Sequence, residues 1–329
     1  MTSRQASFSD IEHGSARRTT RRSEFLRIMD EIIVWEEWVD LIRPYYYKEG
    51  GVGRPCRDLE TMLRMYLLQV WYTLSDEGCE DACIDIWPMR TFLKLKTIDT
   101  QVPDATTLAN FRHMMEDNKL DELLFSTLRK CLEDGGVMYK GGTIMDATFI
   151  ESTTSTKNAA GKRDPEMHQA KKGKNWHHGM KLHIGVDAGT GLVHSVSGTA
   201  ANVHDLDEAH KLMRKDDHTG YGDAGYQGIE KRPEIKDDEH LKEVDFRINI
   251  RKGSVKTDFD KGIENRKSSV RSKVEHAFHI AKNIFGFKKT PYRGIKKNLA
   301  RARMVLLSVN LYMLMMAGRR IDGSPLEVT

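Results

Sequence analysis

The sequence contains few cysteines, no long apolar run and no apolar segment near its start. Its four cysteines are Cys56, Cys79, Cys83 and Cys131. Because Cys79 and Cys83 have no second pair nearby, a zinc site is disfavoured and reduced thiols packed as small hydrophobic residues are expected. The longest apolar run, 304–317, is too short to cross a bilayer and fits a buried helix. We therefore expect a cytoplasmic protein with no signal peptide and no membrane partner.

A glycine-rich phosphate-binding loop of the nucleotide-hydrolase type is also missing, which argues against a nucleotide cofactor. The composition is otherwise ordinary for a globular protein, with 39% hydrophobic and 30% charged residues and a mean hydropathy of −0.56. At 329 residues the chain is long enough for two domains or three.

Basic residues are concentrated in three stretches, although the net charge is only +4. Residues 247–303 hold 17 Lys and Arg against 4 Asp and Glu, residues 157–181 hold 7 against 2, and residues 1–22 hold 5 against 2. Any single Lys-rich stretch is more often a solvated surface than a binding site. Three of them together indicate a polyanionic partner.

The first part of the chain predicts a basic tail followed by a helical domain. Residues 1–23 are polar and rich in Arg, Ser and Thr, so we expect a disordered tail there. Helical spacing predicts helices within 25–47 (ending before Pro44) and over 59–72, 76–87, 108–117 and 121–133. The candidate N-caps are Asp58, Ser75 and either Asp104 or Thr106. The prediction is an all-helical DNA-binding domain over 24–134. Its short helices are compatible with a helix-turn-helix, but which helix would contact base edges stays open.

From residue 135 the hydrophobic pattern changes to a period of two, typical of strands. Strands are predicted over 143–151, 180–186, 192–197, 219–223 and 244–250, and helices over 205–214, 229–238, 270–284 and 295–316. The second and third strands are joined by a glycine-rich turn and predict an antiparallel hairpin. This order predicts an α/β domain over 135–329.

Three acidic residues stand out within this second part. Asp146 lies inside an otherwise apolar strand, where an aspartate requires a partner or a metal. Asp223 lies at a strand end among glycines, which allow close backbone approach. Glu275 lies on a helix, with Arg271 one turn before it. The simpler interpretations are a surface aspartate, a turn aspartate and a salt-bridge ladder on a solvated helix.

Together the three carboxylates suit the chemistry of phosphodiesters. Mg²⁺ prefers carboxylate oxygens, and two such ions about 4 Å apart can activate an attacking oxygen and stabilise a leaving one. Nearby cations on the same helix face, including His279 and Lys282, can neutralise a bound strand. The Lys- and His-rich segment 157–178 favours DNA contact over metal binding. Its candidate DNA-contacting residues are Lys171, Lys172, Lys174 and Trp176.

The order of motifs resembles bacterial insertion-sequence transposases of the IS5 type, within the DDE transposases. The segments that carry the resemblance are 103–112, 162–187, 201–205, 222–226 and the Arg271, Glu275 and Lys282 signature. The resemblance covers about residues 25–316. One departure is Ser268, which stands where the family signature usually has a tyrosine.

The resemblance implies a ribonuclease H-like catalytic domain with Asp146, Asp223 and Glu275 as ligands of Mg²⁺, for which Mn²⁺ can substitute. Arg271 and Lys282 would contact the DNA backbone. The implied reaction is hydrolysis at the transposon end, followed by attack of the freed 3′-hydroxyl on target DNA. The implied partner is double-stranded DNA, both ends and target, bound by a homodimer. Two alternatives stay open: an inactive DNA-binding inhibitor from a decayed element, and a related metal-dependent nuclease.

Overall fold

The computed structural model describes residues 19–47, 56–95, 100–157, 161–172, 175–251 and 257–326. Two compact units make up the chain, Met1–Asn118 and Lys119–Thr329, and each is described by itself. The tail expected over 1–23 lies outside the described residues as far as residue 18. Residues 21–23, which were expected to belong to the tail, are helical, because Thr20 caps a helix that begins at Arg21.

The first unit is helical, as predicted. Its helices are α2 (Arg21–Ile32), α3 (Trp35–Tyr46), α4 (Leu59–Tyr72), α5 (Asp76–Asp85), α6 (Trp87–Phe92) and α7 (Ala105–Asp117). The side chains of Asp58, Ser75 and Asp104 accept backbone N–H bonds at the starts of α4, α5 and α7, so these predicted caps are confirmed. α4 is buried on nearly every face, and the other helices of the unit surround it.

Three features of the helices in this unit differ from the prediction, two of them at prolines. The single helix expected within 25–47 is interrupted between α2 and α3, and α3 then continues through Pro44. Pro44 lies in the last turn of α3, where one missing N–H bond is tolerated. Pro88 does not end a helix but lies in the first turn of α6, where its fixed φ suits a helix start.

The second unit is built around one sheet. Its strands are β1 (Thr143–Glu151), β2 (His168–Lys172), β3 (Asn175–Asp187), β4 (Val193–Ala200), β5 (Thr219–Gly222) and β6 (Asp245–Ile248). The order is β2-β3-β1-β5-β6, with β4 also paired to β3. β3 runs antiparallel to β1 and β4, whereas β5 is parallel to β1 and β6 to β5. This is the predicted α/β, ribonuclease H-like arrangement, with β1 at its centre.

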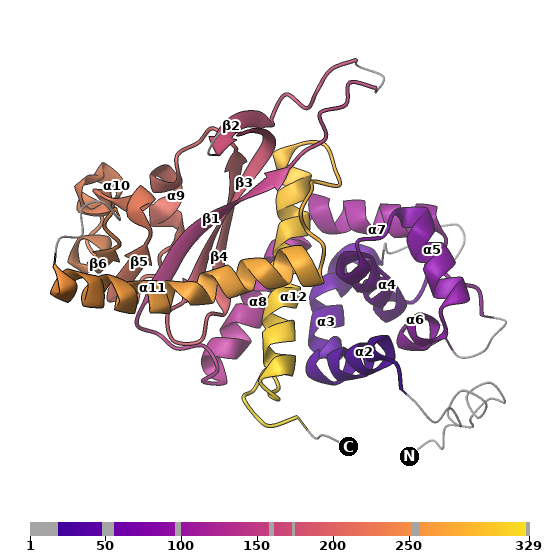
Figure 1. Cartoon of the computed structure of the whole chain (residues 1–329). Helices are drawn as coiled ribbons and strands as arrows, with labels where there is room; N and C mark the ends of the chain where they lie inside the picture. The colour runs from indigo at the N-terminus through magenta and orange to yellow at the C-terminus, as the bar shows by residue number, and fades with distance from the viewer. Residues whose placement is uncertain are drawn as a thin grey trace. The chain divides into compact units, whose positions relative to one another are not determined.

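Helices cover both faces of this sheet (Figure 1). Met145 packs against α9 (Asp205–Leu212) in an apolar cluster, while the next residue, Asp146, contacts α11 (Asp258–His279). Because successive strand residues point to opposite faces, α9 and α11 lie on opposite sides of β1. α11 starts at Asp258, earlier than the predicted residue 270. At its other end it continues directly into a π-helix, Ile280–Ile284.

The C-terminal helix α12 (Ile295–Met316) is a core helix of this unit. Among the described residues it is long and apolar enough to cross a membrane, but 67% of its most apolar window is buried inside the protein. Its polar residues have structural partners: the Asn310 side chain bonds both the N–H and the C=O of Val193 in β4. α8 (Leu120–Asp134) packs on α12 through an Asp121–Arg303 ion pair of 3.0 Å. The unit boundary therefore falls before α8, not after residue 134 as expected.

Smaller elements complete the unit. They are the 3₁₀ turns Ala224–Tyr226, Ile229–Lys231 and Leu241–Glu243 and the short helix α10 (Pro233–Lys236). The prediction of one helix over 229–238 was wrong, because Arg232 is extended and Pro233 starts a separate turn. β2 was not predicted, since its five residues are mostly polar and show no apolar alternation.

Candidate active site

Asp146 lies in the middle of β1 and is largely removed from water. Its side chain is 20% exposed; Oδ1 accepts the Ala147 N–H at 2.8 Å, and Oδ2 lies 3.7 Å from the Arg271 guanidinium. Burial raises the pKa of this carboxyl from 3.8 to about 6, against the lowering effects of the Ala147 amide and Arg271. The negative charges of Asp223 and Asp205 raise it further. The structure therefore holds a desolvated carboxylate that a bound cation would stabilise.

Asp223 follows β5 directly, and β5 is the strand next to β1. The parallel pairs Thr143↔Gly220 and Ile144↔Tyr221 have a constant register. Continuing that register by two residues places Asp223 beside Asp146. Asp223 Oδ1 accepts the Gly225 N–H at 2.8 Å, which fixes the carboxylate, and Oδ2 has no hydrogen bond to the described residues.

Gly225 is required by this close approach. A Cβ at position 225 would lie 2.9 Å from Asp223 Oδ1, closer than real Cβ contacts. The glycine-rich sequence around Asp223 therefore has a physical reason: the loop folds back tightly onto the carboxylate.

Tyr226 and Asp205 also belong to this region, and the sequence interpretation missed both. The Tyr226 side chain is buried, and its hydroxyl has no hydrogen-bond partner among the described residues. Burial and the nearby charges of Asp146, Asp205 and Asp223 raise the pKa of the Tyr226 hydroxyl well above its ordinary value. Asp205 begins α9 and pairs with the Lys181 ammonium at 3.0 Å. The 201–205 motif was the one signal that pointed to Asp205.

Glu275 lies on α11, one turn after Arg271. Arg271 is turned toward the sheet, with Nη1 3.2 Å from Asn249 Oδ1 and Nη2 3.7 Å from Asp146 Oδ2. Residues four apart share a helix face, so Glu275 borders the side of α11 that faces Asp146. Its side chain is exposed, and no three-residue group of potential metal ligands occurs in the described part of the chain. The structure thus brings Asp146 and Asp223 together and leaves Glu275 at the rim.

A divalent cation is the group that the fold family implies, and the residues fit it. Two carboxylates meet here, one inside β1 and one at the end of β5, and each uses only one oxygen in its backbone hydrogen bond. The unpartnered Tyr226 hydroxyl beside them is a buried polar atom that lacks a ligand. Oxygen-only donors of this kind suit Mg²⁺ or Mn²⁺. Asp146 and Asp223 would hold the ion.

Lys282 and His279 lie further along the same helix. The Lys282 ammonium donates to the Thr148 hydroxyl at 2.7 Å and to the Phe149 carbonyl at 2.9 Å, joining the π-helix to β1. His279 is exposed, and its Nδ1 lies 3.0 Å from the Asn283 amide nitrogen. Lys282 therefore has a structural role here besides the DNA contact expected of it.

The other predicted DNA-contacting residues lie on the hairpin formed by β2 and β3. Lys171 and Trp176 are paired across its strands and so share a face. Trp176 is 66% exposed, so it is not packed in the core of the unit. Lys172 belongs to β2, and Lys174 lies outside the described residues.

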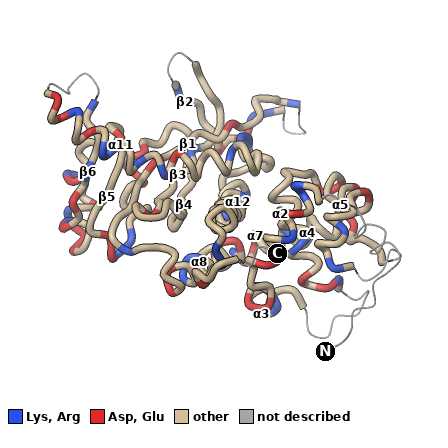
Figure 2. The backbone as a smooth tube through the Cα atoms, turned by 60° about the horizontal axis from the view of Figure 1, so that its bottom comes forward, with Lys and Arg blue, Asp and Glu red and all other residues tan. Residues whose placement is uncertain are grey.

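The surroundings of the aspartates contain many cations. Figure 2 shows blue Lys and Arg segments along α11, beside β1 and β3. Several of these cations already have partners within the protein: Lys267 donates to the Ile248 carbonyl and Lys273 to the carbonyls of Ala188 and Gly189. The positive charge predicted from 247–303 thus both stabilises the position of α11 and surrounds the site.

Comparison with known proteins finds two matching family models and one solved structure. The family model described as "Transposase DDE domain" matches residues 140–311, more than half of the chain. A second model, described as "Transposase domain (DUF772)", matches residues 15–114 in the helical unit. A solved structure, a piggyBac transposase synaptic complex with hairpin DNA, aligns at 10% identity and a TM-score of 0.45, covering 88% of this chain and 72% of that one. On the first match, the chain belongs to the transposase DDE domain family.

Proposed function

We propose that this protein is a DNA transposase that cuts the strand at the end of its own mobile element and joins the freed 3′-hydroxyl to target DNA. The observation that carries the proposal is the meeting of Asp146, inside β1, with Asp223, at the end of the neighbouring strand β5, with Asp146 desolvated. Membership of the transposase DDE domain family supports a DNA-cutting and DNA-joining enzyme.

The residues have distinct proposed roles. Asp146 and Asp223 hold the metal, and Glu275 completes the set from α11 when DNA is bound. The metal, Mg²⁺ or Mn²⁺, supplies Lewis acidity that activates the attacking oxygen and stabilises the leaving one. Arg271 lies beside Asp146 and balances its charge before the metal binds. Burial of Asp146 keeps water away from the carboxylate, which strengthens its interaction with a cation.

DNA binding is proposed for the surfaces around this site. Trp176 and Lys171 on the β2–β3 hairpin are exposed on one face and suit stacking on a base and contact with a phosphate. We further propose an IS5-type element in a bacterial cytoplasm, binding to the terminal inverted repeats through the helical unit, and a homodimer that holds both ends.

A strand-transfer assay tests the proposal. The substrate is a labelled duplex that carries the element's own terminal repeat, incubated with Mg²⁺ or with EDTA. We expect Mg²⁺-dependent nicking followed by joined products, both lost in Asp146→Asn, Asp223→Asn and Glu275→Gln while end binding survives. Full activity in any variant would remove that residue from the site. End binding without cleavage would favour an inhibitor from a decayed element, and nicking without joining would favour a nuclease.

A further inference from the structure

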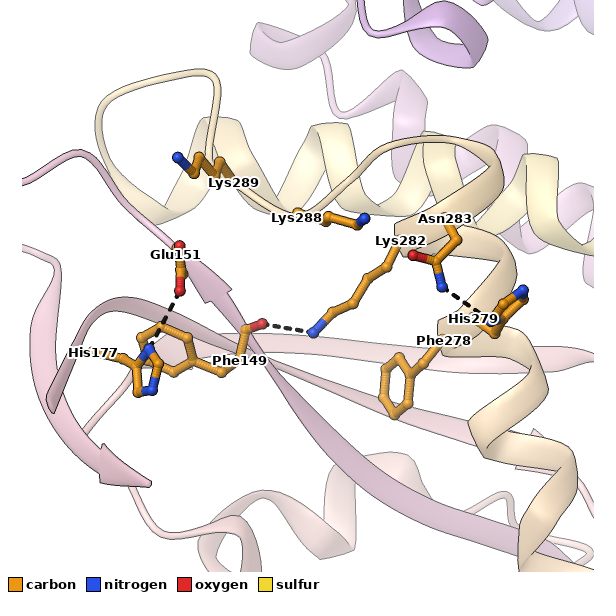
Figure 3. A pocket seen from close by; sticks show the side chains of 9 residues that line it. All are labelled: Phe149, Glu151, His177, Phe278, His279, Lys282, Asn283, Lys288 and Lys289. Carbon is orange, nitrogen blue, oxygen red and sulfur yellow. Dashed lines mark hydrogen bonds and ion pairs between the residues drawn. The ribbon is translucent and has the colours of Figure 1, made fainter. Parts of the chain in front are cut away.

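A cavity of about 450 Å³ lies beside the end of β1 (Figure 3). It is formed by the end of β1, by His177 of β3, by the end of α11 with the following π-helix, and by the segment that contains Lys288 and Lys289. This volume is within the roughly 300–1,000 Å³ range of small-ligand sites. Neither the metal site nor the strand chemistry proposed above uses this cavity.

Aromatic rings form two of its walls. The rings of Phe149 and His177 lie 5.4 Å apart, centre to centre, and the Phe278 ring faces the cavity from α11 (Figure 3). Planar rings around a space of this size suit a planar ligand, because a nucleobase can stack on them whatever its sequence.

The remaining walls are polar and mostly basic. The Asn283 amide nitrogen lies 3.0 Å from His279 Nδ1, and Glu151 Oε1 lies 3.3 Å from His177 Nδ1 (Figure 3). The amide oxygen of Asn283 and the second carboxylate oxygen of Glu151 can accept hydrogen bonds from the edge of a base. Lys288 and Lys289 are exposed, and neither ammonium has an ion-pair partner among the described residues. An aromatic space with unpaired cations at its mouth is complementary to one base and its adjoining phosphates.

The position along β1 relates this cavity to the proposed chemistry. Phe149 is three residues after Asp146, which corresponds to roughly 10 Å along the strand, and this odd spacing turns the two side chains to opposite faces of β1. The cavity is nevertheless bordered by the helix that faces Asp146, because Phe278 and Lys282 also line it. Stacked DNA advances about 3.4 Å per nucleotide, so roughly 10 Å along the strand corresponds to about three stacked nucleotides. Phe278 lies one turn after Glu275, so the same helix borders both places.

We propose that this cavity binds one unpaired nucleotide of the DNA strand being processed, with its base against Phe149 and His177 and its phosphates near Lys288 and Lys289. The proposal rests on the proposed function, since it assigns a substrate subsite to that reaction. It requires no covalent step. Its effect is to hold the strand at a fixed distance from Asp146 and Asp223.

Binding can be measured without catalysis, using single-stranded probes in EDTA. The first probe is a thymidine hexanucleotide with one central 5-iodouracil, whose photo-cross-link to the full-length protein is mapped by mass spectrometry. The second is a hexamer with the same phosphates and no bases. We expect cross-links to Phe149, His177 or Phe278 and roughly tenfold weaker binding of the baseless hexamer.

Two variants separate base from phosphate recognition. Phe149→Leu keeps the apolar volume but removes the stacking ring, so it should weaken the thymidine hexamer severalfold and leave the baseless hexamer unchanged. Lys288→Gln with Lys289→Gln should weaken both probes equally and reduce the salt dependence of binding. The matched control, Lys296→Gln with Lys297→Gln, removes two exposed lysines nearby and should leave the cross-link map unchanged. If Phe149→Leu does not fold, His177→Ala serves as the second stacking variant.

The outcomes are distinguishable. Cross-links outside the cavity, equal binding of the two probes, or equal competition by poly-glutamate of matched charge would each overturn the nucleotide proposal. Cleavage and joining by a protein that shows no cross-link in the cavity would overturn only this proposal. Cross-links in the cavity of a protein that never cuts its end DNA would support the subsite and overturn the proposed function.

Discussion

Asp146→Asn should make the protein more stable in metal-free buffer while it removes the proposed activity. The pKa of Asp146 is about 6 in the folded protein against 3.8 ordinarily, a difference of about two pH units, which corresponds to roughly 3 kcal/mol. The sign follows from the raised pKa: folding opposes ionisation of this carboxyl, so the cost is absent near pH 4, grows between pH 4 and 6, and is complete above pH 6. Asparagine is similar in size to the protonated carboxyl and carries no such cost.

Allowing for relaxation around the site, we expect a gain of about 1–3 kcal/mol at pH 7.5, or roughly 2–12 °C in the melting temperature of this unit. Calorimetry in EDTA measures the gain, and hydrogen exchange of the β1 amides assigns it to the correct unit. Glu275→Gln is the matched control, because it removes a carboxylate that is exposed, and it should change stability by about 0.5 kcal/mol at most. Equal stability of Asp146→Asn and wild type at pH 7.5, or an equal gain at pH 4, would refute the reasoning.

The remaining predictions concern neighbouring parts of the second unit. Gly225→Ala should reduce strand cleavage at least tenfold with little change in melting temperature, because the new Cβ displaces the Asp223 carboxylate. Normal cleavage by this variant would show that cleavage does not depend on the position of the Asp223 carboxylate. Burial lowers the pKa of His194 well below its ordinary value, so stability that is complete above about pH 6.5 should be lost as the pH falls further. The free energy of unfolding of Asp146→Asn, measured against pH, tests this, because that variant lacks the Asp146 carboxyl, whose contribution changes with pH in the opposite direction. A free energy of unfolding that stays constant below pH 6.5 would contradict it. Trp176→Ala should leave stability unchanged and weaken DNA binding severalfold in a mobility-shift assay; unchanged binding would exclude stacking. Lys282→Ala should destabilise the unit by about 1–2 kcal/mol, since two hydrogen bonds to β1 are lost; a salt slope of DNA binding that stays the same would argue against a phosphate contact.

Local signals in the sequence were sufficient for the elements that depend on neighbouring residues. β1 and α12 have the residue bounds that their hydrophobic patterns predicted. The caps Asp58, Ser75 and Asp104 act on amides three residues away, so their effect is readable from the sequence. Predictions failed where a proline or a polar segment was interpreted by propensity alone, as at Pro44, Pro88 and β2.

The candidate site was predictable in part, for a different reason. Asp146 was selected because an acidic residue in an apolar strand contradicts local propensity, and Asp223 because the glycines around it allow close backbone approach. The pairing of the two could not be derived from spacing, because it depends on β5 joining the edge of β1 in parallel. The buried Tyr226 hydroxyl and the raised pKa of Asp146 depend on desolvation, which has no signature in the sequence.

The sequence by itself determined the helical and α/β parts of this protein, the acidic residues of the site and the concentration of basic charge in 247–303, because periodicity, propensity and composition are properties of the chain. Only the tertiary structure decided that α8 belongs to the second unit, that Arg271 faces Asp146 while Glu275 stays exposed, and that an aromatic cavity lies beside β1. Each of these depends on contacts between residues far apart in the chain, and packing selects such contacts from many that the sequence allows.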